Sequence, residues 1–493
     1  MADDAAAAFA PPTVFQVSRL LKKQLRAERI SHLRSIALDA DFVQQTHAAH
    51  DAPPLFANLR CGAWYASPAL RRGECYFKST DGHAGAWEFS LSRINLAVAL
   101  AAARHGCAMI VDSTRRGKRF PDALTKTVPI WCAVINRAVA EERGGGGAEW
   151  AELRLPPWVP PSEAAQIEAR LGGWVAALRR PALRPVLDEL VRALERPLAP
   201  SWISPNDAPA PQAADAAAPF SRVLCVTASR VMSAEASREV RSWTYVQGAA
   251  DDHENWSRGL SAAQWWAWHE PLMRAAATSS AAAEDELCRL QAEAADEAVA
   301  PHGGGAPTAL WRSGLLLAAA ADASAPAVWE HADAVLDVGA CSRAESLGAD
   351  GARSYLHVAL AAGKRAQPSK HWWQTDVLPA ALGFARAQLR RGRRVVVTCD
   401  DGVERAPAVA LAALIALYDG DGVPDVTTLR AVPPAAATTK EALRARLALL
   451  QGVYPAANVP RHIMKELNNF FVAATGGWSR LVWGDEAPST AIA

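Results

Sequence analysis

A cysteine and an arginine separated by five residues stand where a short apolar stretch gives way to a helical pattern. The segment reads CDDGVER from Cys399 to Arg405, directly after VVVT and before a long apolar run. A loop between a strand and a helix points backbone N–H groups and the positive helix end at an anion. Gly402 permits the tight turn, Arg405 offers a planar fork to phosphate oxygens, and the same field should lower the pKa of Cys399. The spacing predicts a phosphate-binding loop of the cysteine-phosphatase type; a buried cysteine beside a surface arginine is the plainer alternative.

The parts that a cysteine phosphatase needs for turnover are incomplete around this loop. Such an enzyme uses a carboxylic acid to protonate the leaving oxygen, usually from the loop after a neighbouring strand. Here that stretch, residues 361–370, reads AAGKRAQPSK without Asp or Glu, and Asp376 follows inside a predicted helix. The hydroxyl residue that usually follows the arginine is Ala406. We therefore predict phosphate binding without hydrolysis, and Lys364 and Arg365 add positive charge for a polyanionic ligand.

Two aspartates in the loop are unusual neighbours for a bound phosphate. Asp400 and Asp401 either turn away into solvent or hold a Mg²⁺ ion that bridges phosphates of the ligand. The loop CDDGVER also resembles that of phosphoinositide phosphatases. A cysteine phosphatase acting on a phosphoinositide, RNA or protein substrate is therefore the alternative function.

A second group of reactive side chains lies on the glycine-punctuated turn CYFKSTDGHAGAWEF, residues 75–89. Lys78, Asp81 and His83 stand close together there, beside aromatic residues. A lysine, a carboxylate and an imidazole in one turn can bind phosphate and transfer a proton. The alternative is a structural histidine with satisfied ring nitrogens. We take Asp81 and His83 as candidate catalytic residues and Lys78 as a candidate donor-binding residue.

A basic loop, DSTRRGKR, follows the apolar strand candidate CAMIV of residues 107–111. A loop that leaves a strand end holds its side chains in fixed positions, and phosphate-binding groups collect in such loops. A solvated basic loop is the alternative. The four cations proposed as phosphate ligands are Arg115, Arg116, Lys118 and Arg119.

A third cluster, VQGAADDHENW, places carboxylates after a turn of small residues. Asp251, Asp252 and Glu254 supply the oxygen ligands that Mg²⁺ prefers, and either aspartate could act as a catalytic base. Equally, the segment could be an N-cap followed by acidic residues in the first turn of a helix. Trp64 and Trp87 flank the basic motifs and could stack on bases.

The composition bounds what these side chains can do. The 493-residue chain has a formal net charge of +1, so RNA binding must rely on local basic clusters. One such basic cluster consists of Arg19, Lys22 and Lys23, on the polar side of a helical pattern that begins near residue 14. This cluster either contacts RNA phosphates or is a solvated helix face. The eight cysteines form no CxxC pair, which fits a reducing compartment. Without a signal peptide or a bilayer-length apolar run, we expect a soluble cytoplasmic protein.

Strands and helices alternate from about residue 329 onward, which predicts an α/β domain with a parallel sheet. The successive segments are AVLDVG, YLHVAL, a helix over 380–389, VVVT and a helix from 406. We expect an N-terminal domain over 1–327 that opens with a helical segment over 1–50, a second domain over 328–485 and a tail over 486–493. Within the first domain, 223–226 is a strand candidate, and 161–179 and 185–194 are expected to be helices.

Several long motifs occur in one order along the chain. They include NLRCGAWY, CYFKSTDGH, IVDSTRRGKRFPDALTKTVPIWCAVIN, YVQGAADDHENW, LHVALAAGKRAQ and VTCDDGVERAPAVALAALIALY. Together they resemble the initiator tRNA phosphoribosyltransferase family, the tRNA adenosine-64 2'-O-ribosylphosphate transferases, over most of the chain. The resemblance implies an α/β protein with a family-specific α+β N-terminal domain and a C-terminal domain similar to dual-specificity phosphatases.

The resemblance also implies an activity. Members of the family transfer a 5-phosphoribosyl group from phosphoribosyl pyrophosphate to the ribose 2'-hydroxyl of adenosine 64 of cytoplasmic initiator methionyl tRNA, which keeps that tRNA out of elongation. Such a donor needs several anion sites and Mg²⁺, and loss of diphosphate leaves an oxocarbenium-like sugar stabilised by orientation and charge. The usual signature of nucleotide phosphoribosyltransferases is absent, so the donor site must be built differently. We expect no membrane and no obligate protein partner; a non-catalytic phosphate-binding module is the third hypothesis.

Overall fold

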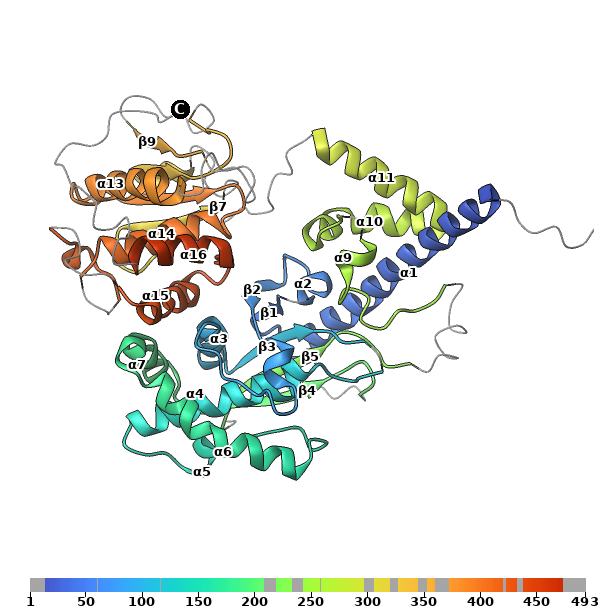
Figure 1. Cartoon of the computed structure of the whole chain (residues 1–493), viewed down its shortest axis with the longest axis horizontal. Coiled ribbons are helices and arrows are strands. Elements are labelled where there is room, and N and C mark those ends of the chain that lie inside the picture. The colour runs from blue at the N-terminus through green and yellow to red at the C-terminus, as the bar shows by residue number, and fades with distance from the viewer. Residues whose placement is uncertain are drawn as a thin grey trace, which may run out of the picture.

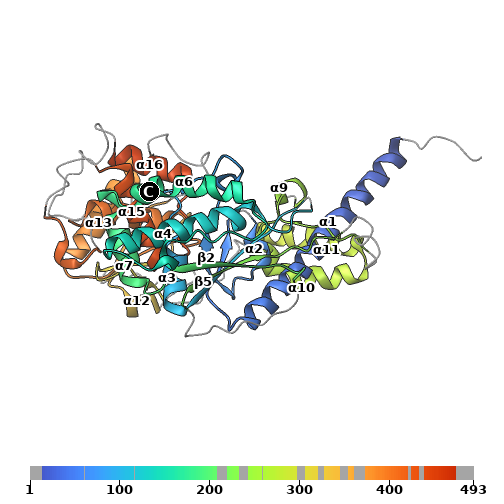
Figure 2. The same ribbon diagram turned by 90° about the horizontal axis from the view of Figure 1, so that it is seen from below.

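Figure 1 shows the computed structural model of the chain, in which two domains are each built around a sheet. The longest helix, α1 (Val14–Ala49), confirms the helical pattern predicted from residue 14, and its first turns project beyond the rest of the molecule (Figures 1 and 2). No helix of the described residues, α1 included, is long and apolar enough to cross a membrane. The described residues are 14–59, 61–115, 117–207, 219–232, 243–257, 259–296, 306–319, 327–344, 353–359, 372–419, 423–431 and 438–472.

The first domain contains a wholly parallel sheet with strand order β2-β1-β3-β5-β4. The strands are β1 (Leu55–Asn58), β2 (Arg71–Cys75), β3 (Cys107–Asp112), β4 (Leu198–Ile203) and β5 (Ser221–Thr227). The predicted strands at 107–111 and 223–226 are thus confirmed as β3 and β5. This α/β arrangement differs from the α+β domain that was expected, because the short strands are separated by long irregular segments that hide the alternation. The chain passes from β2 across β1 to β3, so the direction of strand succession reverses between β1 and β3.

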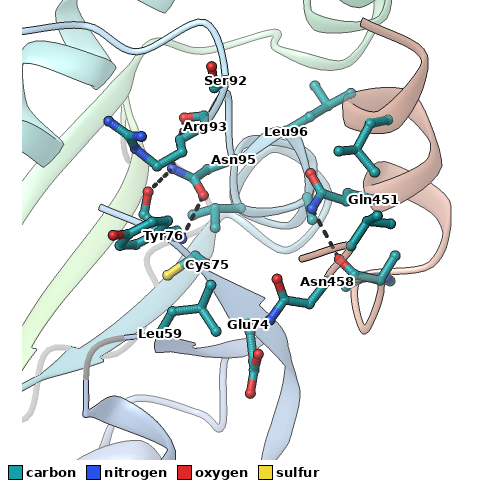
Figure 3. Close-up of a pocket in the computed structure, with 16 residues that line it drawn as sticks. Leu59, Glu74, Cys75, Tyr76, Ser92, Arg93, Asn95, Leu96, Gln451 and Asn458 are labelled. Carbon is teal, nitrogen blue, oxygen red and sulfur yellow. Dashed lines mark hydrogen bonds between the residues drawn. The ribbon is translucent and has the colours of Figure 1, made fainter. Parts of the chain in front are cut away.

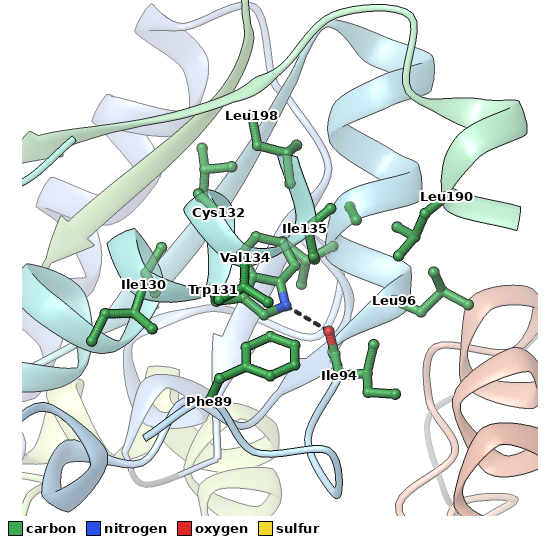
Figure 4. Close-up of a cluster of buried hydrophobic side chains, with 14 of the residues drawn as sticks. Phe89, Ile94, Leu96, Ile130, Trp131, Cys132, Val134, Ile135, Leu190 and Leu198 are labelled. Carbon is green, nitrogen blue, oxygen red and sulfur yellow. Dashed lines mark hydrogen bonds between the residues drawn. The ribbon is translucent and has the colours of Figure 1, made fainter. Parts of the chain in front are cut away.

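Helices cover both faces of this sheet, as is usual for parallel strands. Alternate β3 residues point to opposite faces: Ala108 and Ile110 join one apolar core, and Met109 joins the other. In the first core the Trp131 Nε1 donates to the Ile94 carbonyl at 2.6 Å (Figure 4). The helices contributing to that core are α3 (Leu96–His105), α4 (Val128–Glu142), α6 (Pro161–Leu178) and α7 (Arg184–Ala193), of which the last two confirm the predicted helices. The other core contains residues of α1, α2 (Gly62–Tyr65), α10 (Ala262–Thr278) and α11 (Ser280–Asp296).

The second domain has a five-stranded sheet with order β6-β7-β10-β8-β9, in which β6 alone is antiparallel to its neighbour. The strands are β6 (Thr308–Ala309), β7 (Leu315–Ala319), β8 (Ala334–Asp337), β9 (Ser354–His357) and β10 (Val395–Cys399). Its helices are α12 (Ala327–His331), α13 (Leu378–Leu389), α14 (Arg405–Ala416), α15 (Lys440–Val453) and α16 (Arg461–Phe471). Because β7 pairs with β10, this sheet begins before residue 327, where the boundary was predicted. The run LLLAAAA around β7 reads equally well as helix or strand, which concealed it.

Helix α15 joins the two domains. Ala448 and Leu449 belong to a core of the first domain, whereas Leu450 belongs to the core of the second. A Cβ on Gly73 of β2 would lie 2.6 Å from the Pro455 Cβ, so the backbones approach closely beside this helix. Figure 1 shows α15 lying against α3 and α7. Such a close-packed, apolar junction holds the domains in one relative position.

Candidate functional site

Polar side chains meet at the carboxyl edge of the first sheet, between β1 and β3, where the strand succession reverses. Asp112, the last residue of β3, is fully buried and accepts hydrogen bonds from Asn58 Nδ2 at 2.8 Å and from the Cys61 thiol at 3.1 Å. The Ser113 N–H donates to the same carboxylate at 2.8 Å. These three donors satisfy the hydrogen-bonding oxygens of the buried Asp112 carboxylate, and they fix the position at which the basic loop leaves the sheet. Open parallel sheets bind ligands at such reversal points.

The basic loop and the aspartate turn of residues 247–252 come together at this edge. Arg115 Nε lies 3.2 Å from an Asp251 carboxylate oxygen, and the same guanidinium contacts Asp252. Gly248 has a φ of +64°, and a Cβ there would lie 2.6 Å from the Thr114 carbonyl oxygen. Two motifs separated by more than 130 residues in the sequence, which were assigned separate roles, therefore form one structural unit.

The carboxylates of this turn do not form a ready metal site. Asp251 and Asp252 face Arg115, while Glu254 is exposed on the short helix α9 (His253–Trp256). Within the described part of the chain, no three His, Cys, Asp or Glu side chains converge as cation ligands. Asp252 stands at the N-cap of α9 and Glu254 lies in its first turn, as the N-cap alternative predicted, although the Asp252 side chain accepts no capping hydrogen bond. The role that the geometry gives both aspartates is to orient Arg115.

In the turn with Lys78, Asp81 and His83, the aspartate is buried, whereas the lysine and the histidine are accessible to solvent. Asp81, in the short helix η1 (Ser79–Gly82), is buried and lies 2.5 Å from Arg93. Lys78 and His83 are exposed, and the His83 side chain retains 52% of its accessible surface. A buried carboxylate in an ion pair makes a poor proton acceptor, so the geometry favours His83 over Asp81 as a base.

Asp122 gathers several cations beside His83. Its Oδ2 lies 3.7 Å from His83 Nε2 and 3.0 Å from Lys118 Nζ, and its Oδ1 lies 3.0 Å from Lys126 Nζ. Burial opposes ionisation of Asp122, but hydrogen bonds from Lys126 and Lys118 prevail and lower its pKa. This carboxylate therefore positions an imidazole and two ammonium groups at one place on the sheet edge.

The other predicted ligands have different fates. Arg119 Nε donates to Ser204 Oγ at 2.9 Å, just beyond β4. Trp64 and Trp87 retain only 2% and 5% of their surface, so the prediction that they stack on bases was wrong; both fill the core. Residues outside the described part are Arg116, Lys364 and Arg365, together with the side chains of Arg19, Lys22 and Lys23.

The Cys399 loop has the predicted strand–loop–helix shape between β10 and α14. Gly402 has a φ of +68°, and a Cβ there would lie 2.9 Å from Ala319 Cα, which confirms the need for glycine. The two aspartates keep contact with solvent, as one expectation had it, but each also bonds within the loop. The Asp401 Oδ1 accepts the Val403 N–H at 2.9 Å inside the loop, and Asp400 contacts the guanidinium of Arg405. The loop thus presents its donors to its own carboxylates.

The chemistry of Cys399 follows from this arrangement. Burial, followed by the Asp401 carboxylate, raises the pKa of the Cys399 thiol to about 12. The thiol donates to Asp401 Oδ1 at 3.2 Å. The predicted lowering of the Cys399 pKa was therefore wrong, because the thiol is buried and, in addition, faces the Asp401 carboxylate. Asp376 lies within the short helix η5 (Trp373–Val377), as predicted. A protonated thiol is a weak nucleophile, so this loop lacks the thiolate that a cysteine phosphatase uses.

A pocket of about 140 Å³ lies at the domain junction (Figure 3). Glu74 and Leu96 line its first-domain side, and Gln451 and Asn458 line the other. The Asn458 N–H donates to the Val403 carbonyl at 2.8 Å, so this wall is continuous with the Cys399 loop. None of the predicted site residues that the structure describes lines the pocket.

Sequence reasoning missed residues that organise the sheet edge. Asn58, Cys61 and Asp112 each stand at or just after a strand end, and that position was the available signal. Gln247 was missed as well; its amide accepts from the Gly117 N–H at 3.1 Å and donates to the Lys118 carbonyl at 2.7 Å.

Comparison with known proteins decides the family. The model of the Rit1 N-terminal domain matches residues 21–290, more than half of the chain, and the model of the Rit1 DUSP-like domain matches residues 354–471. The chain belongs to the Rit1 family. The second match agrees with the predicted similarity of the C-terminal domain to dual-specificity phosphatases, and the parallel strands of both sheets confirm the α/β class.

Two relatives extend the comparison. An uncharacterized protein of Schizosaccharomyces pombe is 41% identical over 244 residues, which cover 49% of this Rit1-family chain and 52% of that protein. The tRNA A64-2'-O-ribosylphosphate transferase of Saccharomyces cerevisiae is 36% identical over 277 residues, which cover 52% and 53% of the two chains. The chain thus spans about half the length of the curated relatives it matches.

Solved structures also resemble part of the chain. DUSP15 has a TM-score of 0.27 at 16% identity, covering 37% of this chain and 100% of that one. Human DUSP28 has a TM-score of 0.26 at 15% identity, covering 35% of this chain and 97% of that one.

Proposed function

We propose that this Rit1-family protein transfers a 5-phosphoribosyl group from phosphoribosyl pyrophosphate to the ribose 2'-hydroxyl of adenosine 64 of initiator methionyl tRNA, in the cytoplasm. The observation that carries the proposal is the similarity to the Saccharomyces cerevisiae transferase, which includes 277 aligned residues. The structure supports it by bringing three separately predicted motifs to one sheet edge. The proposal includes no membrane and no obligate protein partner.

In this reaction the 2'-oxygen of the tRNA attacks C1 of the donor ribose, and the C1–O bond to diphosphate breaks. The proton of the 2'-hydroxyl needs an acceptor. His83 is the best placed of the four candidates, because Asp81 is paired with Arg93, and Asp251 and Asp252 face Arg115. Asp122, 3.7 Å from the imidazole, would stabilise the protonated ring.

Departing diphosphate carries charge that cations at the sheet edge would stabilise. Arg115 is 37% exposed, Lys118 is 59% exposed, and Lys78 is exposed as well. A diphosphate would compete with Asp252, itself 37% exposed, for the guanidinium of Arg115. Because the carboxylates of residues 251–254 do not converge, we assign no step to a protein-bound Mg²⁺.

The proposal is tested with the purified full-length chain, labelled phosphoribosyl pyrophosphate, MgCl₂ and either initiator or elongator tRNA. The expected result is label on initiator tRNA only, with one diphosphate released per label. Equal labelling of both tRNAs, or labelling of neither, would overturn the proposal. Diphosphate release that stays at background when tRNA is added would instead support a non-catalytic module.

A further inference from the structure

An exposed tryptophan stands beside the basic loop. Among the described residues, Trp158 is the most exposed of the large hydrophobic side chains, at 50% of its surface. It belongs to the Pro-rich segment LPPWVPP that precedes α6. An indole on a surface gains free energy when a flat apolar partner covers it. Neither the core nor the proposed chemistry uses this side chain.

The indole is held in place by its neighbours. Phe120 stacks on Trp158 with ring centres 5.4 Å apart and planes 17° apart, and Trp202 meets it edge-on at 6.2 Å. Trp202 is itself fixed, because its Nε1 donates to the Leu124 carbonyl at 2.8 Å. A ring supported in this way presents its exposed part in one orientation, so little rotamer entropy is lost on binding.

A cation completes the surface. The Arg119 guanidinium lies 5.8 Å from the Trp158 ring centre and 5.3 Å from that of Phe120. Its Nε donates to Ser204 Oγ beyond the carboxyl end of β4, on the same sheet edge as Arg115 and Lys118, and the same guanidinium, 42% exposed, contacts the Asp207 carboxylate. An aromatic face next to a guanidinium and further cations suits a nucleobase with its adjoining phosphates.

We infer that Trp158, supported by Phe120 and Arg119, stacks on a base of the RNA substrate. This inference rests on the proposed function for the identity of the RNA, but it concerns binding and not group transfer. Bases inside an A-form stem are covered on both faces, so the base that Trp158 contacts is unpaired or lies at a helix end. The contact positions the RNA while the acceptor hydroxyl reaches His83.

The experiment measures binding of the full chain to deacylated initiator tRNA, without donor, at several salt concentrations. Trp158→Ala should weaken binding about 5- to 150-fold, the range for loss of one stacked base, with an unchanged salt dependence because no cation is removed. Trp158→Phe keeps a stacking ring and should stay within about threefold of the parent, whether or not the alanine variant folds fully. The matched control is Tyr76→Ala, which removes an exposed ring that also lies under an arginine but borders the domain-junction pocket.

Polyphosphate is used as a probe that carries phosphates but no bases. Trp158→Ala should bind polyphosphate with the same affinity as the parent. The inference is overturned if Trp158→Ala binds tRNA within twofold of the parent. It is equally overturned if Trp158→Phe or Tyr76→Ala loses as much affinity as Trp158→Ala, or if polyphosphate binding falls in parallel. The labelling assay distinguishes the base-stacking inference from the proposed transfer reaction. If the parent labels tRNA but Trp158→Ala does not weaken tRNA binding, only the stacking inference is wrong. If Trp158→Ala weakens binding but the parent labels no tRNA, only the proposed transfer is wrong.

Discussion

Arg115 in the first domain and Arg405 in the second are both held by aspartates, but in opposite surroundings. The Arg115 side chain is 37% exposed and shares that exposure with Asp252, whereas the Arg405 side chain is 10% exposed within a closed loop. An ion pair between two exposed side chains contributes little to stability and exchanges partners readily, whereas Arg405 is packed inside its loop and only its partner Asp400 is exposed, at 44%. The comparison teaches that the more recognisable motif in the sequence offers the less accessible guanidinium: Arg405 is less open to an external anion than Arg115.

The largest expected effect is the loss of activity when the exposed arginine, Arg115, is replaced. Arg115→Ala should lower kcat/KM for tRNA labelling by about 100-fold or more, because a preorganised cation facing the departing diphosphate is lost. Arg179→Ala is the matched control, since that arginine is 39% exposed and also binds two carboxylates, away from the sheet edge. If both variants lose activity equally, the special role of Arg115 is wrong.

The buried arginine should affect folding instead. Arg405→Ala removes a side chain that is only 10% exposed and should lower the free energy of unfolding by roughly 2 kcal/mol through lost packing, because the Asp400 left behind is 44% exposed and stays solvated. Urea denaturation measures this change. Activity per folded molecule should stay within threefold of the parent. A variant of normal stability that no longer labels tRNA would show that the loop binds substrate after all.

A smaller effect is expected from Asp122, whose lowered pKa marks a stabilised carboxylate. A carboxyl whose pKa is lower in the folded state stabilises the protein above its unfolded pKa, and this contribution is lost as pH falls through the folded pKa. Asp122→Asn should therefore destabilise the protein by about 1 kcal/mol at pH 7. The difference from the parent should shrink as pH falls below the ordinary pKa of an aspartate and through the lower pKa of Asp122; a difference that does not shrink would point to lost packing and not to charge.

The smallest effect is expected at Cys399. Its thiol, with a pKa of about 12, is protonated at neutral pH, so Cys399→Ser should change the labelling rate by less than about twofold. The exposed Cys288 and Cys341 provide a comparison, because alkylation with iodoacetamide should reach them before Cys399. A tenfold fall in labelling by a stably folded serine variant would restore thiolate chemistry as a possibility.

The sequence predicts local structure well where one segment determines it. The apolar run ending at Asp112 and the glycine demand at Gly402 are examples, because strand periodicity and a positive φ depend on few neighbours. The meeting of Arg115 with Asp251 was not predictable in detail, since it requires the strand order to be known. The inward turn of Asp401 was missed for a related reason: the carboxylate competes with an external anion for the same N–H groups, and spacing does not decide that competition.

Helix α15 has a consequence for any shortened form of this protein. Leu96 and Leu100 of the first domain lie within 3.4 Å of where a Cβ on Gly452 would stand, and Ala448 and Leu449 cover the same core. A chain that stops before α15 would expose this surface to water and would lose part of its hydrophobic stabilisation. The second domain therefore keeps an apolar surface of the first domain out of water, whether or not its cysteine reacts.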